Sequence, residues 1–472
     1  MSRFTDKHPS SRASDGRSAR PKAPRGRRAP VVEKRRAMHP RDREELRRTE
    51  GVVVTPPVPA HRKYAAPAGT PEEKAEWYKR AWIDAGLPKG AFSALVSAED
   101  PLDGGYGESY STAQDHFGKY VFKAISRDYD KNAPLELSER HRALYREFQA
   151  QLGRPHLAAL RAALVAVHVR SVAGNGFALL VQIHRASAAV IGEAKKFAEW
   201  AMRLPDGIVS VQLLLLRQTV PAALGNVPAN AELRPLAGPA KLEVDFPLWN
   251  VPLLVHPLEG CHAHRALWSE MVDDCMRLLQ LRKDDGVVDL CSGSGAIALE
   301  ASRRGAFVVA LDRKPGVEEM LALNAARLKT GRPRFVRAEL DANVLARVLD
   351  RIEGHRKVVL DLPGMQTPPG IPQICKATNV DKIARFFGNL HQLREELDRW
   401  RHHGYMLHRA KAYDTRPGGP GLEVLALFRR DSSGLLDGSR RPAPRANAKR
   451  PRGEGKPEGS APTVRFRQSK SS

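Results

Sequence analysis

Hydrophobic and polar residues alternate with a period of two in the middle of the chain, the spacing typical of half-buried strands. The pattern covers residues 165–170 and 177–184, and Gly174-Asn-Gly between them is a hairpin turn signal. A helical pattern at 189–203 and an apolar run at 209–216 follow. The order strand, strand, helix, strand predicts an α+β unit.

The region before this unit has a mostly helical pattern. Thr70 is followed by proline and two glutamates, a helix start signal, and the predicted helix ends near Gly86. Residues 135–152 are charged with helical spacing, whereas the glycine-containing stretch 100–117 is predicted to be a loop. This region therefore predicts helices joined by a loop.

Strands and helices alternate from 286 to 430, which predicts a parallel, doubly wound sheet. Two short strands, 241–246 and 252–256, and a helix at 263–280 come before it. The predicted fold class is α/β, a Rossmann-like doubly wound sheet preceded by a smaller α+β domain. The predicted division of the chain is a basic arm at 1–69, a mostly helical region at 70–155, an α+β domain at 156–260, the doubly wound domain at 261–430 and a basic tail at 431–472.

Charge changes the picture at the two ends. Residues 1–50 and 429–472 together carry 17 of the 24 net positive charges of the 472-residue chain. Both segments are rich in proline, serine, glycine and alanine, so they bury too little apolar surface to fold alone and are predicted to be disordered. Basic arms suit a polyanion, and RNA is the predicted partner; a purely solubilising role is the alternative.

Composition also limits the compartment. No run of eighteen apolar residues occurs, so we expect no membrane-spanning helix and no membrane partner, and the start lacks the apolar core of a secretory signal. We expect the cytoplasm, with the mitochondrial matrix as the alternative because the start contains arginine and serine. The cysteines form no C-x-x-C pair, which argues against an iron–sulfur or zinc site and for a reducing compartment: Cys261, Cys275, Cys291 and Cys375.

The segment Gly286–Glu300 combines an apolar strand, a turn of small residues and a helix. Gly293 and Gly295 remove Cβ atoms where the backbone passes close to a ligand, and the helix N-terminus adds N–H groups and a positive dipole end. Asp289 stands just before the turn. In nucleotide-binding folds a cofactor rests at such a turn.

A second strand, Val308–Asp312, ends in an acid about 20 residues farther on, the position that grips ribose hydroxyls. The third glycine of the dinucleotide pattern is absent, and dehydrogenases do not usually place an acid at the position of Asp289. This combination resembles class I methyltransferases, with a NAD-type fold as the alternative. The resemblance implies S-adenosyl-L-methionine as the cofactor, bound by Asp289, Gly293, Gly295, Asp312 and Glu339, the last at the adenine edge.

Residues 160 to 430 resemble the RNA 5-methyluridine methyltransferases. The shared features are the strand–helix–strand insert, Asn324, Asp361-Leu-Pro and the final strand Gly421–Phe428. The resemblance implies that Asp361 faces the target base and that Glu423 stands where the family carries its general base. Three further residues are candidate RNA contacts: Asn389, Arg429 and Arg430.

The family attacks C6 of uridine with a cysteine thiolate, which makes C5 nucleophilic, and a base then removes the C5 proton. The nucleophile belongs in Ser-Cys-Asn-Pro at a strand end, where this chain has Phe387-Gly388-Asn389-Leu390. A glycine cannot form the adduct. Cys375 lies nearby in a predicted helix and is interpreted as a core thiol rather than a relocated nucleophile.

The family also carries Gln-x-Asn before the helix at 263–280, and the corresponding residues here are His262 and His264. With His256 they invite a metal interpretation, but no carboxylate or cysteine set of known geometry accompanies them, so no metal is predicted. They are interpreted as loop histidines near the cofactor or the RNA.

Two functions remain open after these departures. The first is a methyltransferase-like protein that uses S-adenosyl-L-methionine on rRNA or tRNA, with the covalent 5-methyluridine route lost and Asp361 and Glu423 serving direct transfer to a nitrogen or oxygen. The second is an inactive homologue that binds RNA and acts as an assembly or structural factor, for example on ribosomal assembly intermediates. The absent third glycine and Asp289 argue against a third interpretation, an oxidoreductase on a similar fold.

Overall fold

The computed structural model describes residues 66–98, 107–114, 120–124, 139–205, 207–222, 224, 227, 231–259, 264–314, 316–362, 365–415 and 421–431. Nearly all of the predicted arm at 1–69 and of the predicted tail at 431–472 lies outside these residues, as do Cys261, His262 and Pro363. No helix in the described ranges is long and apolar enough to cross a membrane.

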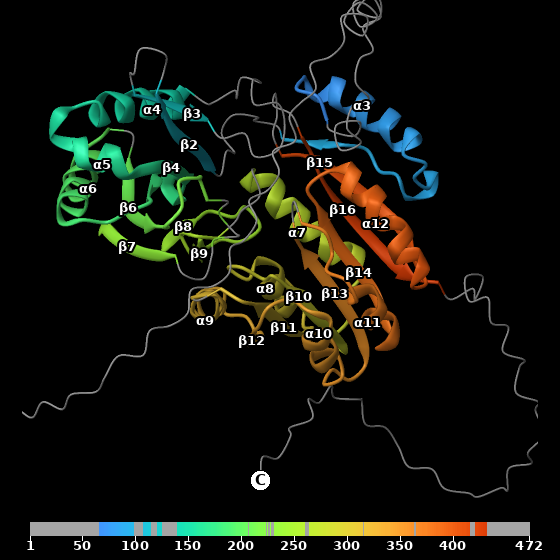
Figure 1. Cartoon of the computed structure of the whole chain (residues 1–472). Helices are drawn as coiled ribbons and strands as arrows, with labels where there is room; N and C mark the ends of the chain where they lie inside the picture. The colour runs from blue at the N-terminus through green and yellow to red at the C-terminus, as the bar shows by residue number, and fades with distance from the viewer. Residues whose placement is uncertain are drawn as a thin grey trace, which may run out of the picture. The chain divides into compact units, whose positions relative to one another are not determined.

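An eight-stranded sheet forms the larger part of the structure (Figure 1), with the strand order β1-β15-β16-β14-β13-β10-β11-β12. Its strands are β1 (Val96–Ser97), β10 (Asp285–Leu290), β11 (Phe307–Asp312), β12 (Arg334–Arg337), β13 (His355–Asp361), β14 (Val380–Phe387), β15 (Tyr405–Asp414) and β16 (Glu423–Arg430). Strands β10 to β14 are parallel, but β16 lies antiparallel between β14 and β15. The predicted parallel, doubly wound sheet is therefore present, with β16 as an antiparallel strand. Strand β16 forms hydrogen bonds with β14 on one side and β15 on the other. The alternation of strands and helices in the sequence does not show in which direction such a strand runs.

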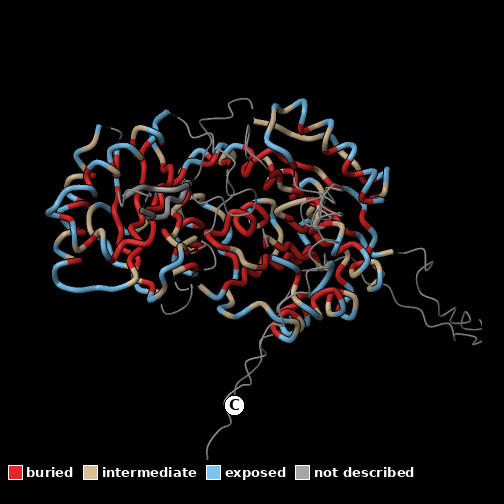
Figure 2. Tube along the Cα trace, turned by 45° about the horizontal axis from the view of Figure 1, so that its top comes forward, coloured by how far each residue is buried: buried red, intermediate tan, exposed pale blue. Residues whose placement is uncertain are grey.

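Helices cover both faces of this sheet. One core cluster contains apolar residues of the first face, with helices α3 (Pro71–Asp84), α10 (Ala342–Leu349), α11 (Ile371–Ala377) and α12 (Leu390–His402). The other contains α7 (Arg265–Leu279), α8 (Ala296–Arg303) and α9 (Val317–Arg327), together with the two-stranded sheet of β8 (Leu242–Val244) and β9 (Leu253–Val255). A sheet buried on both faces explains the nearly continuous apolar runs of β10 and β13. Figure 2 shows the buried residues concentrated in the interior of the fold.

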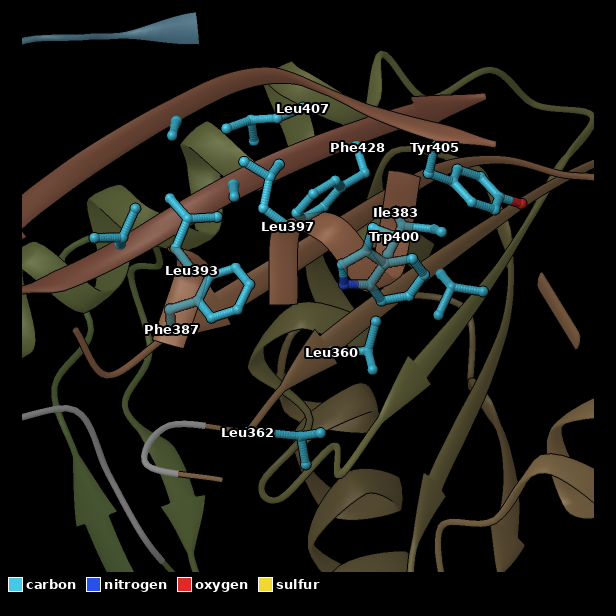
Figure 3. Packing of buried hydrophobic residues seen from close by; sticks show 14 of the residues in the cluster. Leu360, Leu362, Ile383, Phe387, Leu393, Leu397, Trp400, Tyr405, Leu407 and Phe428 are labelled. Atoms are coloured by element: carbon cyan, nitrogen blue, oxygen red, sulfur yellow. The ribbon is translucent and has the colours of Figure 1, made fainter. Parts of the chain in front are cut away.

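The first core cluster is rich in aromatic residues where α12 meets the sheet (Figure 3). Trp400 stacks on Phe428 with ring centroids 5.4 Å apart, and Tyr405 meets the Trp400 ring edge-on at 5.8 Å. Each polar ring group finds a partner, since Trp400 donates to Glu396 and Tyr405 donates to the Val380 carbonyl. This packing fixes α12, whose N-terminus follows β14 directly.

Helix α3 packs in the core on the first face of the eight-stranded sheet, although most strands of that sheet lie far from α3 in sequence. Thr70 caps this helix, as the start signal predicts, and it also forms a capping box with Glu73. The ammonium group of Lys74 lies 2.6 Å from Asp414 at the end of β15, and both side chains are fully buried. After the 3-10 turn η1 (Lys89–Ala91), β1 pairs in parallel with the same end of β15.

A six-stranded sheet with the order β3-β2-β4-β5-β6-β7 forms the second part. Gly174 and Asn175 both have positive φ, as a tight hairpin between β4 and β5 requires, which confirms the predicted turn. Apolar residues of its helices pack together on one face of the sheet. Its elements are β2 (Gly107–Gln114), β3 (Tyr120–Ala124), α4 (Glu139–Leu152), η2 (Pro155–Leu157), α5 (Ala158–Ala163), β4 (Leu164–Ser171), η3 (Ala173–Asn175), β5 (Phe177–Ile183), α6 (Ala188–Ala201), β6 (Ile208–Leu215) and β7 (Glu232–Ala237).

The stretch expected to be a loop, 100–117, contains β2, so that expectation is corrected. Glycines and serines hide this strand from local pattern reading, while pairing with β4 supplies its backbone hydrogen bonds. The region 70–155 contributes strands to both sheets. Its first part, to Ser97, joins the eight-stranded sheet, and its second part, from Gly107, joins the six-stranded sheet.

Candidate cofactor and substrate site

The strand register brings the candidate residues to one edge of the eight-stranded sheet. Asp312 ends β11 and Asp361 ends β13, on either side of β10, which carries Asp289. Gly388 follows the last residue of β14, and Glu423 begins the antiparallel β16 at the same level. The carboxyl ends of parallel strands are where ligands bind in open α/β sheets. Residues separated by more than 130 positions in the sequence therefore share one candidate site.

The loop after β10 is shaped by positive φ angles at Cys291, Gly293 and Gly295. The amide groups of Cys291 and Ser292 donate to the carbonyl of Leu311 on β11, at 2.8 and 3.2 Å. These contacts hold the turn against the neighbouring strand, and α8 begins immediately after Gly295. The predicted strand, turn and helix are all present.

The carboxylate of Asp312 ties the loop to β11. Its Oδ2 accepts from the Gly293 amide at 3.0 Å, and its Oδ1 accepts from the Lys314 amide at 2.9 Å. The side chain is buried, so these two amide bonds orient it firmly. The acid predicted to bind ribose hydroxyls thus also fixes the shape of the glycine loop.

Asp289 is fully buried, and neither of its carboxylate oxygens has a hydrogen-bond partner among the described residues. Burial raises the pKa of this carboxyl well above its usual range, and the charges of Asp361 and Asp312 raise it further. The nearby amide of Ala298 lowers the pKa by a smaller amount than burial raises it. A buried acid of this kind favours either a bound proton or a nearby cation.

Glu259 is a residue of this site that the sequence analysis missed. Its Oε1 accepts from the Ser294 amide at 2.6 Å, and a Cβ built on Gly293 would lie 2.4 Å from the same oxygen. The residue as a whole is half-buried, but its carboxylate is enclosed, and burial raises its pKa. Nothing in the local pattern marks it, because the contact joins two segments 35 positions apart.

A buried ion pair holds the segment that follows Asp361. Arg385 of β14 is fully buried beside Glu396 of α12, with 3.3 Å between Nη2 and Oε1. The guanidinium group donates to the carbonyls of Leu362, at 3.1 Å, and of Met365. Glu396 in turn accepts from the amide of Thr367 at 2.7 Å. Sequence analysis missed this pair because an arginine within an apolar strand carries no signal of its partner.

The residues at the strand end where the family resemblance places a nucleophile have ordinary structural roles in the described structure. Gly388 has no left-handed φ, and its amide donates to the Gln392 side chain at 2.9 Å. Asn389 caps α12 by accepting from the Gln392 amide at 2.9 Å. Cys375 is fully buried in the core, where burial raises its pKa, which agrees with the interpretation as a core thiol.

Of the remaining predicted site residues, Glu339 is exposed at the same edge as Asp312, whereas the two arginines lie elsewhere. Glu339 comes two positions after the end of β12, and its side chain is 71% exposed and paired with Arg313. Arg429 pairs in register with Lys382 near the start of β14, and Arg430 follows it. Both arginines are therefore at the opposite edge of the sheet from Asp361 and Glu423.

The histidines take structural roles where they are described. The Nδ1 atom of His264 caps α7 by accepting from the Leu267 amide at 3.4 Å. His256 accepts from the Leu258 amide at 3.2 Å, and burial lowers its pKa to about 4. Among the described residues, no group of histidine, cysteine and acidic side chains could hold a metal ion.

Comparison with known proteins supports the family resemblance. The chain is 28% identical over 179 residues to a 23S rRNA (uracil(1939)-C(5))-methyltransferase of Klebsiella pneumoniae, which covers 38% of this chain and 41% of that protein. A protein of the same name from Psychromonas ingrahamii is 30% identical over 129 residues, covering 27% of this chain and 28% of that one. The chain thus spans about two fifths or less of these relatives' length. No family model matches the chain.

The fold is shown by a solved structure. The tRNA (uracil-54, C5)-methyltransferase of Pyrococcus abyssi, in complex with S-adenosyl-L-homocysteine, superimposes with a TM-score of 0.50 at 14% identity. The similarity covers 75% of this chain and 82% of that one. The eight-stranded sheet therefore has the fold of class I methyltransferases.

Proposed function

We propose that this chain is an S-adenosyl-L-methionine-dependent methyltransferase-like protein that acts on rRNA or tRNA without the covalent 5-methyluridine route. The observation that carries the proposal is the pairing of a complete glycine loop with Gly388 at the position of the nucleophile. The relatives are named as rRNA methyltransferases, and this supports RNA as the substrate class.

The residues at the loop fit the cofactor. Gly293 and Gly295 present backbone without side chains, and Asp312 stands one strand away. The buried carboxylate of Asp289 suits a ligand with positive charge. When bound, S-adenosyl-L-methionine supplies an electrophilic methyl group.

Direct transfer to a nitrogen or oxygen needs a positioned nucleophile rather than a covalent adduct. Asp361 ends β13 beside the loop and is held by the segment that Arg385 supports. We propose that Asp361 orients the target base and accepts its proton, with Glu423 on the far side of Gly388 as a second acid.

The second candidate is an inactive homologue that binds RNA as an assembly or structural factor. The same glycine at 388 favours it, because the family's chemistry needs a thiolate there. This candidate predicts RNA binding without methyl transfer.

Replacing Asp361 by alanine is expected to lower methyl transfer by at least about 100-fold, the usual contribution of a positioned acid or base. The measurement is incorporation of labelled methyl groups from the cofactor into total RNA. Asp398→Asn, an exposed acid on α12, is the matched control and should keep full transfer. Absence of transfer by the natural chain, with RNA binding intact, would favour the second candidate.

The basic ends are expected to contribute to RNA affinity through phosphate contacts. Deleting residues 1–50 and 432–472 should weaken RNA binding and flatten the dependence of log K on log salt, because fewer counterions are released. Fluorescence anisotropy across a salt series measures both quantities. An unchanged slope would show that the ends do not contact RNA.

A further inference from the structure

The carboxylate of Glu259 lies on the glycine loop at the place where a ligand is expected to pass. Its Oε1 accepts from the Ser294 amide at 2.6 Å and leaves no room for a Cβ on Gly293. A glycine at position 293 is therefore needed for the carboxylate of Glu259 to reach the loop.

The backbone of Glu259 is fixed from two sides. Its amide donates to the carbonyl of His256 at 2.9 Å. The guanidinium group of Arg170, on β4 of the six-stranded sheet, donates to the carbonyl of Glu259 and, at 3.4 Å, to that of His256. Arg170 is only 4% exposed, so the position of Glu259 is built into the fold.

Charges of both signs lie around Glu259. Burial raises the pKa of Glu259 the most, Lys314 lowers it, and Asp312 raises it by a smaller amount. Asp361 and Asp312 likewise raise the pKa of Asp289, whose buried oxygens have no hydrogen-bond partner among the described residues. The enclosed carboxylates of Glu259 and Asp289 would each be stabilised by a ligand cation placed beside them.

We propose that Glu259 is a further cofactor-binding residue whose carboxylate receives the α-ammonium group of a ligand carrying an amino-acid moiety. This inference rests on the proposed function, in which that ligand is S-adenosyl-L-methionine. Arg170 is then a positioning residue that holds the Glu259 backbone and links the six-stranded sheet to the cofactor loop.

The test is calorimetric titration of the full chain with S-adenosyl-L-methionine, S-adenosyl-L-homocysteine and 5′-methylthioadenosine, the last of which has no amino-acid moiety. Glu259→Gln and Glu259→Ala should bind the first two about 10-fold or more weakly, the loss of a hydrogen bond to a charged group. Binding of 5′-methylthioadenosine should not change. Glu243→Gln, which removes an exposed acid paired with Arg327, is the matched control and should bind all three normally.

The outcomes separate this inference from the proposed function. Unchanged affinity in both Glu259 variants rejects the inference alone, and tighter binding rejects it by showing that the carboxylate obstructs the loop. Failure of the natural chain and of both variants to bind any of the three ligands rejects both proposals. Matching circular dichroism and melting temperature of the variants ensures that a weaker affinity reports the contact and not the fold.

Discussion

The Gly388→Cys variant should form a stable covalent adduct with RNA that contains 5-fluorouridine, whereas the natural chain should form none. A thiolate at this position would add to C6, and C5 would then take the methyl group of S-adenosyl-L-methionine. Because C5 carries fluorine in place of the proton that a base removes, the enzyme cannot be released. The adduct migrates more slowly than the free protein in denaturing electrophoresis. We expect this band for Gly388→Cys and no such band for the natural chain.

The structure supports this substitution at two levels. Gly388 has no left-handed φ, so the backbone accepts an L-residue there. It also lies between the strand ends that carry Asp361 and Glu423, the acids assigned to the target base. Gly388→Ser is the control, since a hydroxyl of similar size is a much weaker nucleophile. If Gly388→Cys binds both RNA and cofactor yet forms no adduct, the target base does not reach this strand end.

The Lys74→Met variant should lose about 3–5 kcal/mol in the free energy of unfolding, the usual result of removing one partner of a buried ion pair. Lys74 and Asp414 are both fully buried, with 2.6 Å between Nζ and Oδ1, so the substitution leaves a carboxylate in a medium that solvates it poorly. Urea unfolding followed by circular dichroism measures the difference.

A double variant separates the charge from the packing. Lys74→Met with Asp414→Leu should recover much of the loss, because apolar residues of similar volume can replace a buried pair. Arg394→Gln breaks an exposed pair with Asp398 and should change stability by less than about 1 kcal/mol. A loss below about 1 kcal/mol in Lys74→Met would contradict the assigned role of the buried pair.

The elements that could be predicted from the sequence are those whose own residues favour the local backbone conformation. The turn at Asp289–Gly295 carries its own glycines, and the strands around it alternate with helices at regular spacing. The hairpin at Gly174 is likewise encoded by residues that tolerate positive φ. For these segments, the local backbone preference and the final fold agree.

The features that escaped prediction depend on partners distant in sequence. The direction of β16 follows from its pairing with β14 and β15, and β2 is a strand because β4 lies beside it. Glu259 and Arg385 belong to the site only through contacts with the loop and with α12. Glu339, by contrast, is an exposed acid just after β12, and its assignment to the cofactor stays a prediction.

The place of β1 beside β15 has a consequence for synthesis of the chain. The ribosome produces α3 and β1 first, then the whole six-stranded sheet, and only at the end the strands that cover them. Until β15 emerges, Lys74 and the aromatic face of α3 with Tyr78 and Trp82 have no partner from that strand. Burial of this helix face therefore has to wait for a strand that follows it by more than 300 residues.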